Sequence, residues 1–273
     1  MATRVLTALV GIPVLLAAIW WSAPWLTILV VLAAVLGIRE LYRLHHSAAS
    51  PLPVFLGALW VTAFILGGQV ASDLNEFLIT CLGIFSGGVF IAALWFIAVY
   101  QGRDFVSTLA YLLGGPVYVG FLLAHALLLR ELGGSGDLGR NLLLFALLVT
   151  FATDTGAFFV GRIIGRHRMA PGFSPNKTWE GALGGFVLAV IAGPALGLLL
   201  DLGLERWQHA AIGATVGVAS QVGDLLESKL KRISQVKDAG SIIPGHGGIL
   251  DRLDSLLVSI PTVYYLVALV FKP

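Results

Sequence analysis

The sequence predicts an all-α, polytopic integral membrane protein with about nine transmembrane helices, and three observations support this fold class. Apolar residues make up 58% of the 273-residue chain, and the mean hydropathy is +0.91. Charged residues make up 12%, whereas soluble domains are about 25% charged. The apolar residues also form long blocks that a water-soluble protein could not bury. The bilayer is therefore the natural solvent for this chain.

The long apolar blocks are the predicted membrane spans. A helix needs about 20 mostly apolar residues to cross roughly 30 Å of hydrocarbon. The nine stretches near this length are 5–21, 25–41, 52–70, 77–100, 106–129, 141–160, 179–200, 207–225 and 253–271. Only Ser22–Pro24 separates the first two, which indicates a tight helical hairpin. The first stretch runs into bulky Trp20 and Trp21 without a small-residue cleavage site, so we expect a span and not a signal peptide.

The distribution of Lys and Arg predicts the orientation of these spans. Thirteen of the 17 basic residues fall on the side of the N-terminus. The other four are Arg130, Arg140, Arg206 and Lys272. We therefore expect a multi-pass protein of the inner (plasma) membrane, with its N-terminus in the cytoplasm and its C-terminus outside. The two longest inside loops, 161–178 and 227–252, carry nine of the thirteen cations, so a site for an anionic substrate is expected there.

The chain divides in character near residue 140. Residues 1–140 hold spans one to five with few polar groups, whereas residues 141–273 hold spans six to nine and both long loops. We interpret the second part as the catalytic region. A net charge of +2 is too small to indicate a nucleic-acid partner, and the single Cys81 excludes a disulfide framework or a cysteine metal site.

The densest polar cluster follows the eighth span. If that span continues as a helix, one face carries Asp224, Glu227, Ser228 and Lys231, at i, i+3, i+4 and i+7. At the start of the ninth span, Asp251, Asp254 and Ser255 again stand at i, i+3 and i+4. Two carboxylate clusters are thus predicted at adjacent inside ends of antiparallel helices.

Carboxylates at such a junction suit Mg²⁺, which takes one or two of them and leaves its other positions to water and phosphates. The cations available for phosphate are Lys231, Arg232, Lys237 and Arg252. The alternative is a basic loop that only satisfies the positive-inside bias and binds lipid headgroups. The carboxylates favour a site, because they contribute little to topology and are costly to desolvate.

A second cluster surrounds the sixth and seventh spans. Asp154 lies inside an apolar span, where an ionisable group is a functional candidate, the alternative being an interhelical hydrogen bond. The following loop reads Phe-Ser-Pro-Asn-Lys-Thr-Trp-Glu-Gly at 173–181. A turn that leads into a helix start with hydroxyls and a Lys is a good anion site, although Ser-Pro-Asn is also ordinary turn chemistry.

These residues resemble the signature of the phosphatidate cytidylyltransferase (CDP-diacylglycerol synthase) family. The matching segments are Ser-Lys-Leu-Lys-Arg at 228–232, Lys-Asp-Ala-Gly at 237–240, Pro-Gly-His-Gly-Gly at 244–248 and Asp-Arg-Leu-Asp at 251–254. Residues 154–158 and 174–181 are also similar to the family, which more often has Tyr where Phe158 stands. Residues 1–140 match only in being membrane spans.

The resemblance implies Mg²⁺-dependent transfer of CMP from CTP to phosphatidic acid for phospholipid synthesis. It implies metal binding by Asp224 and Asp251, with Glu227, Asp154 and Asp254 as additional or supporting ligands. Nucleotide and phosphate binding would fall to Ser174, Lys177, Thr178, Ser228, Lys231, Arg232, Lys237, Asp238, His246 and Arg252. We expect catalysis to depend most on Asp154, Lys177, Asp224, Lys231 and Asp251.

Three other classes of protein fit the sequence less well. A secondary transporter would show midplane polar residues on several spans and repeat symmetry, and the sequence shows neither. A CDP-alcohol phosphotransferase needs an Asp-rich pattern within one helical region, which is missing. A non-catalytic scaffold gives no reason for carboxylates beside four cations. Gly83 and Gly87 make a small-residue face in the fourth span, which suits packing against another helix of the chain, the alternative being a homodimer contact. The expected partners are otherwise the substrates and membrane lipids.

The orientation is testable by labelling single cysteines in a Cys81-free background. We expect a cysteine at position 241 to react only from the cytoplasmic side, because its loop belongs to the cation-rich side. A cysteine at position 203, between the seventh and eighth spans, should react only from outside. Labelling of position 241 from outside alone would contradict the predicted site.

Overall fold

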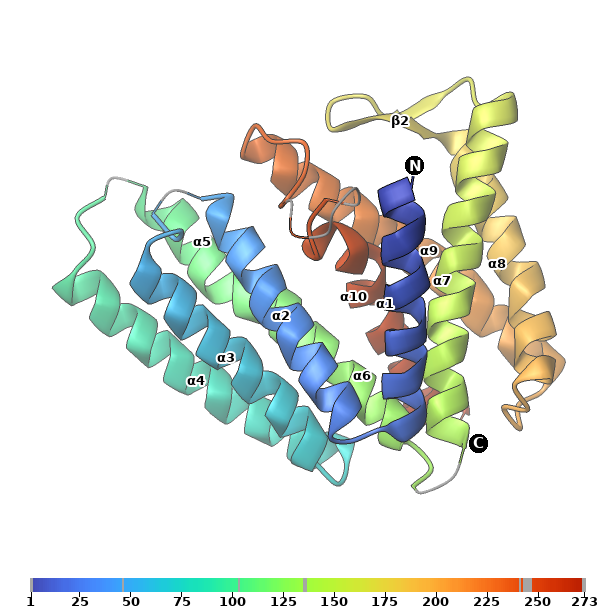
Figure 1. The fold of residues 1–273 in the computed structure, drawn as a ribbon, viewed down its shortest axis with the longest axis horizontal. Coiled ribbons are helices and arrows are strands. Elements are labelled where there is room, and N and C mark those ends of the chain that lie inside the picture. Colours follow the sequence, from blue (N-terminus) through green and yellow to red (C-terminus); the bar gives the residue numbers. More distant parts are fainter. Residues whose placement is uncertain are drawn as a thin grey trace. The chain divides into compact units, whose positions relative to one another are not determined.

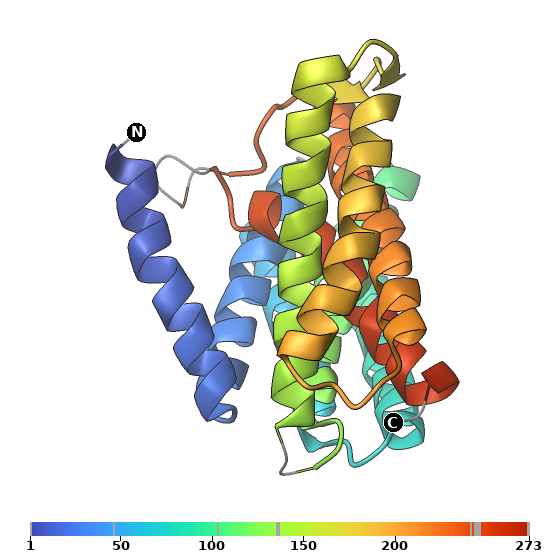
Figure 2. The ribbon, with the colours of Figure 1, turned by 90° about the vertical axis from the view of Figure 1, so that its right-hand side faces the viewer.

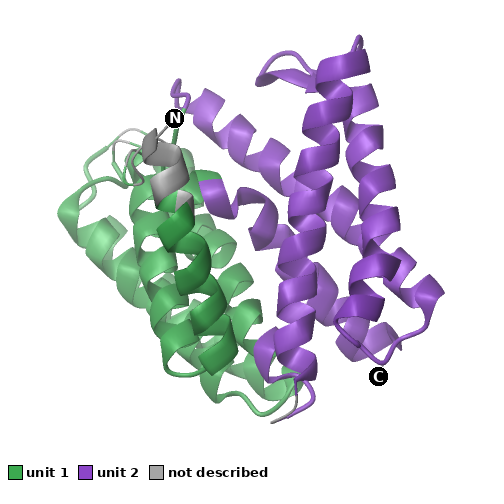
Figure 3. Ribbon diagram, turned by 45° about the vertical axis from the view of Figure 1, so that its right-hand side comes forward, with its two compact units in different colours: residues 1–128, 238–251 green, residues 129–237, 252–273 purple. Residues whose placement is uncertain are grey.

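The computed structural model describes residues 2–45, 47–102, 104–134, 137–240, 242 and 247–271, apart from the side chains of residues 2–6 and 8. These residues form two compact units, coloured separately in Figure 3. Unit 1 contains residues 1–128 and 238–251, and unit 2 contains residues 129–237 and 252–273. The division into spans one to five and spans six to nine stays a prediction.

Unit 1 is a bundle of helices joined by short turns (Figure 1). Its helices are α1 (Ala2–Trp21), α2 (Trp25–Arg43), α3 (Pro51–Val70), α4 (Leu74–Ala98), α5 (Phe105–Pro116), the π-helical turn η1 (Val117–Phe121) and most of α6 (Leu122–Glu131). α3 lies between α2 and α4, and it also packs against α5 and η1. The expected hairpin between α1 and α2 is confirmed.

Unit 2 is built on three long helices that run side by side (Figure 2). Its elements are α7 (Leu138–Ile164), β1 (Arg168–Ala170), β2 (Ser174–Thr178), α8 (Trp179–Leu199), α9 (Arg206–Ile233), α10 (Leu250–Tyr265, which starts in unit 1) and the π-helical turn η2 (Leu266–Phe271). The two strands pair antiparallel, with Arg168 opposite Thr178 and Ala170 opposite Ser174. This hairpin was not predicted from the sequence.

Glycines allow the three long helices of unit 2 to approach closely. A Cβ on Gly185 of α8 would lie 2.7 Å from the Thr153 carbonyl oxygen of α7. A Cβ on Gly213 of α9 would lie 2.5 Å from the Ala189 oxygen of α8. Such small-residue contacts are the usual basis of helix packing in membranes, where apolar burial gives no net drive. They bring the polar ends of α7, α8 and α9 together.

The all-α polytopic class is confirmed, and each of the nine predicted spans is helical. Seven helices in the described part of the chain are long and apolar enough to cross a membrane. Of the other two, α9 has 28 residues but a more polar composition, and α1 has 20 residues, of which the side chains are described only in part. The count of nine membrane crossings therefore stays a prediction.

The glycine contacts predict a selective loss of stability. Gly185→Ala should lower the free energy of unfolding by about 1–3 kcal/mol, because the added methyl group meets backbone that cannot move aside. Gly114→Ala is the matched control, since its Cβ would meet nothing within 4 Å. Thermal unfolding in detergent measures both variants. Equal melting temperatures for the two would contradict the packing argument.

Candidate active site

Unit 2 contains a cavity of about 580 Å³ where the hairpin meets α7, α8 and α9. Five of the predicted site residues line it: Asp154, Ser174, Lys177, Thr178 and Asp224. Its lining also includes Gln221, which sequence reasoning missed, although an amide in an apolar span is a recognisable signal. The Gln221 amide donates to the Gly217 oxygen at 2.8 Å and to the Ala182 oxygen at 3.2 Å. It therefore links α9 to α8 at the cavity wall.

The junction of β2 and α8 fixes the direction of Lys177. Thr178 caps α8, because its hydroxyl oxygen accepts from the Gly181 N–H at 3.1 Å. The Trp179 N–H donates to the His167 oxygen at 2.9 Å, which closes the base of the hairpin. Glu180 accepts from the His167 backbone N–H and lies 2.5 Å from its Nδ1. Lys177 therefore projects from the fixed end of β2.

Lys177 and Asp224 form an ion pair across this cavity. Lys177 Nζ lies 2.6 Å from Asp224 Oδ2, and the two side chains are 24% and 32% exposed. The Ser228 hydroxyl donates to Asp224 Oδ1 at 3.4 Å. Asp154 and Asp254 also lie close enough to Asp224 for their charges to interact. Lys177 thus offsets part of the charge of three neighbouring carboxylates.

The predicted polar face of α9 is confirmed. α9 continues as a helix to Ile233, so Asp224, Glu227, Ser228 and Lys231 share one face. Lys231 Nζ lies 2.6 Å from Glu227 Oε2, and the Glu227 side chain is 1% exposed. Lys231 also interacts with the charge of Asp254. Lys229 points elsewhere and is exposed.

Arg232 braces the hairpin, a contact that the sequence did not predict. Its Nε donates to the Phe173 oxygen and its Nη1 to the Val236 oxygen, each at 3.2 Å. The guanidinium thus holds the turn between the strands to the end of α9. Lys237, Asp238 and Arg252 are exposed. His246 lies outside the described residues.

Asp251 lies in unit 1, where it organises the loop that precedes α10. Its Oδ2 accepts from the Gly248 N–H at 2.8 Å and from the Ala239 N–H at 3.1 Å. Asp224 belongs to unit 2. A metal site shared by Asp224 and Asp251 therefore stays a prediction.

Sequence reasoning missed Glu40, which is buried in α2 and holds the same loop of unit 1. The Leu250 N–H donates to Glu40 Oε2 at 2.8 Å. The sequence did contain a signal, because an acidic residue inside an apolar span is a functional candidate by default.

Oxygen donors in unit 2 fit a hard divalent cation. Among the described residues, no group of three acidic or histidine side chains forms a preformed metal cage. Asp154, Asp224 and Asp254 nevertheless lie near one another. Mg²⁺ is commonly held by one or two carboxylates together with waters and substrate phosphates, so a sparse set of carboxylates beside lysines suits Mg²⁺ bound with a phosphate ligand.

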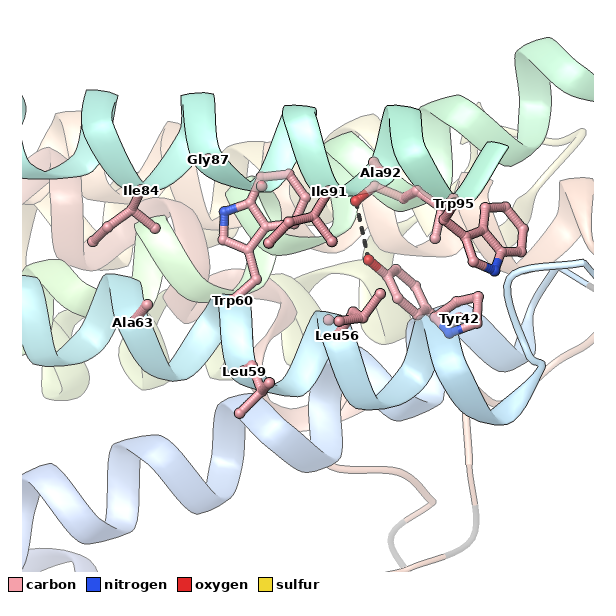
Figure 4. A pocket seen from close by; sticks show the side chains of 14 residues that line it. Tyr42, Leu56, Leu59, Trp60, Ala63, Ile84, Gly87, Ile91, Ala92 and Trp95 are labelled. Atoms are coloured by element: carbon pink, nitrogen blue, oxygen red, sulfur yellow. Dashed lines mark hydrogen bonds between the residues drawn. The ribbon is translucent and has the colours of Figure 1, made fainter. Parts of the chain in front are cut away.

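Unit 1 contains a cavity of about 290 Å³ of different character, lined by α2, α3, α4 and α5 (Figure 4). Trp60, Ile91 and Trp95 contribute to its largely apolar lining. The Tyr42 hydroxyl donates to the Leu112 oxygen at 3.0 Å, so this phenol is already bonded. The lining carries no charged side chain, so this cavity does not suit phosphate chemistry.

Comparison with known proteins gives matches to cytidylyltransferases. The model of the cytidylyltransferase family matches residues 2–270. The phosphatidate cytidylyltransferase of Bacillus subtilis is 31% identical over 98% of both chains. That of Staphylococcus saprophyticus is 32% identical over 96% of both chains. A Brucella suis protein of the same name is 40% identical over 58% of this chain and 57% of its own.

The ion pair predicts an unusual response to magnesium. Lys177→Met should destabilise the apo protein by about 1 kcal/mol, a modest value because both side chains are partly exposed. The same variant should gain more melting temperature on Mg²⁺ addition than wild type, since Mg²⁺ no longer competes with Lys177 for the carboxylates. Thermal unfolding with and without Mg²⁺ measures this, and Lys229→Met is the exposed control. An Mg²⁺ response equal to that of wild type would contradict the competition.

Proposed function

The chain belongs to the cytidylyltransferase family, and we propose that it transfers CMP from CTP to phosphatidic acid, giving CDP-diacylglycerol and pyrophosphate. The observation that carries this proposal is the cavity of unit 2, where Lys177 and Asp224 face each other beside two further carboxylates. A site with exchangeable cations and carboxylates suits two polyanionic substrates. Its position at the ends of apolar helices suits a lipid substrate.

The reaction needs little acid–base chemistry. The phosphate monoester of phosphatidic acid has a second pKa near 6, as other phosphate monoesters do, so it is largely ionised at pH 7. One of its oxygens attacks the α-phosphorus of CTP, a new P–O bond forms, and the bond to the β-phosphate oxygen breaks. Pyrophosphate carries away the electron pair. The protein must therefore bring two anions together and stabilise the charge that develops on the leaving group.

The residues of unit 2 divide these tasks by their contacts. We expect Lys177 to leave Asp224 for a substrate phosphate, because both partners are partly open to the cavity. Ser174 and Thr178 would orient the same phosphate from the hairpin side. Lys231 would face the pyrophosphate, positioned by the buried carboxylate of Glu227.

Mg²⁺ is the proposed cofactor. Asp224 and Asp254 in unit 2 and Asp251 in unit 1 are the proposed ligands, with Asp154 in support. When bound, Mg²⁺ would neutralise phosphate charge and polarise the α-phosphoryl group. Glu227 would contribute through Lys231, because its side chain is enclosed against that lysine.

The described helices indicate a multi-pass membrane protein. We propose that it lies in the plasma membrane with both long loops and the N-terminus in the cytoplasm, where CTP is made. The excess of basic residues on that side supports this orientation. A homodimer through Gly83 and Gly87 of α4 stays a prediction.

The purified protein in detergent should form CDP-diacylglycerol only with CTP, phosphatidic acid and Mg²⁺ all present. Lys231→Ala should lower kcat by at least about 100-fold at saturating CTP, because a preorganised charge in the transition state is typically worth that much. Lys229→Ala, on the exposed face of α9, should retain wild-type kcat. Absence of product from the wild-type protein would contradict the proposed function, and equal losses in both variants would contradict the proposed role of the α9 face.

A further inference from the structure

Glu40 is a fully enclosed carboxylate in an apolar helix. It lies in α2, and its exposed fraction is 0%. A carboxylate in such a setting is costly unless specific partners compensate its charge. Its partners come from the segment 238–251, far away in the sequence but part of the same compact unit.

The first backbone contact is at the start of α10. The Leu250 N–H donates to Glu40 Oε2 at 2.8 Å, and the adjacent Ile249 N–H also bonds to this carboxylate. The first N–H groups of a helix have no partner within the helix and carry partial positive charge. Glu40 therefore caps α10 from a different helix.

The second contact is with two glycines of the same segment. A Cβ placed on Gly240 or on Gly248 would collide with the Glu40 carboxylate. Neither glycine has a positive φ angle, whereas Gly247, which directly precedes Gly248, has a φ of +85°. Gly240 and Gly248 are thus required for space and not for backbone conformation. The carboxylate fits against bare backbone at two points of one loop.

The loop that Glu40 holds carries a residue of the proposed site. Asp251 bonds to the N–H groups of Ala239 and Gly248, so it closes the same loop from within. Glu40 fixes this closed loop to α2. A displacement of the loop would therefore move the Asp251 carboxylate as well.

We propose that Glu40 is a positioning residue for the substrate site. Its carboxylate anchors the loop 238–251 to α2 and thereby sets the position of Asp251, without itself touching a substrate. Only the expected effect of Glu40 on turnover rests on the proposed function. The anchoring itself is a property of the loop and can be measured without substrates.

Hydrogen exchange of the loop amides in detergent tests the anchor directly. Glu40→Ala should raise exchange in peptides covering 238–251 while peptides of α7, α8 and α9 keep wild-type protection. In the same variant, kcat should fall by at least about tenfold, because a small displacement of Asp251 disturbs the geometry on which turnover depends. Glu40→Gln keeps an acceptor oxygen and the side-chain shape, so it should recover much of both properties. Glu76→Gln, at the exposed start of α4, is the matched control and should leave both unchanged.

Two outcomes of the exchange experiment would overturn the inference. One is wild-type loop exchange in Glu40→Ala, and the other is equal damage to the loop by Glu40→Gln and Glu40→Ala. If the wild-type protein makes no CDP-diacylglycerol but Glu40→Ala still raises loop exchange, only the proposed function fails. If the wild type is active and loop exchange does not respond, only the present inference fails.

A double-mutant cycle tests the contact without removing the carboxylate. Gly240→Ala should raise loop exchange and lower turnover in the wild-type background, because its methyl group meets Glu40. Glu40→Asp withdraws the carboxylate by one methylene, so Gly240→Ala should cost less in that background. Contacting residues are expected to be non-additive in this way. Fully additive effects would show that Gly240 and Glu40 do not contact each other, which would overturn the proposal.

Discussion

Charge compensation for carboxylates at the ends of apolar helices is the constraint on which the polar parts of this protein depend. An unpaired carboxylate in such a setting is costly to desolvate. Unit 2 meets this constraint with lysines: Lys177 pairs with Asp224, and Lys231 pairs with Glu227. Unit 1 meets it with backbone, because the Leu250 N–H binds Glu40. These partners decide where the hairpin and the loop before α10 lie.

The two forms of compensation differ in what they permit. A lysine on a flexible stem can exchange a carboxylate for a phosphate without moving the backbone, so the Lys177–Asp224 pair can respond to substrate. A backbone N–H at a helix start cannot leave its acceptor unless the loop moves. The Leu250–Glu40 contact is therefore suited to holding geometry. An enzyme that joins two polyanions needs both a responsive set of charges and a fixed frame around it.

The sequence predicted the site best where residues lie close together on one helix. The shared face of Asp224 and Lys231 followed from helical spacing alone, and α9 confirms it. The pairing of Lys177 with Asp224 depends on how the hairpin, α8 and α9 pack, which local spacing does not encode. The hairpin itself was missed because β1 has only three residues and β2 begins with ordinary turn chemistry. The number of membrane crossings is hard to predict because α9 combines span length with a polar composition.

Glu40 shows that a signature motif can contain residues whose requirement is explained only by a side chain outside the motif. Within the signature segment, the requirement for Gly247 follows from its φ of +85°, a conformation that L-residues with a side chain rarely adopt. The requirement for Gly240 and Gly248 follows instead from the Glu40 side chain that fills the space beside them. That side chain lies in α2, far from the signature segment in the sequence. The loop geometry is therefore specified jointly by the signature and by one carboxylate outside it.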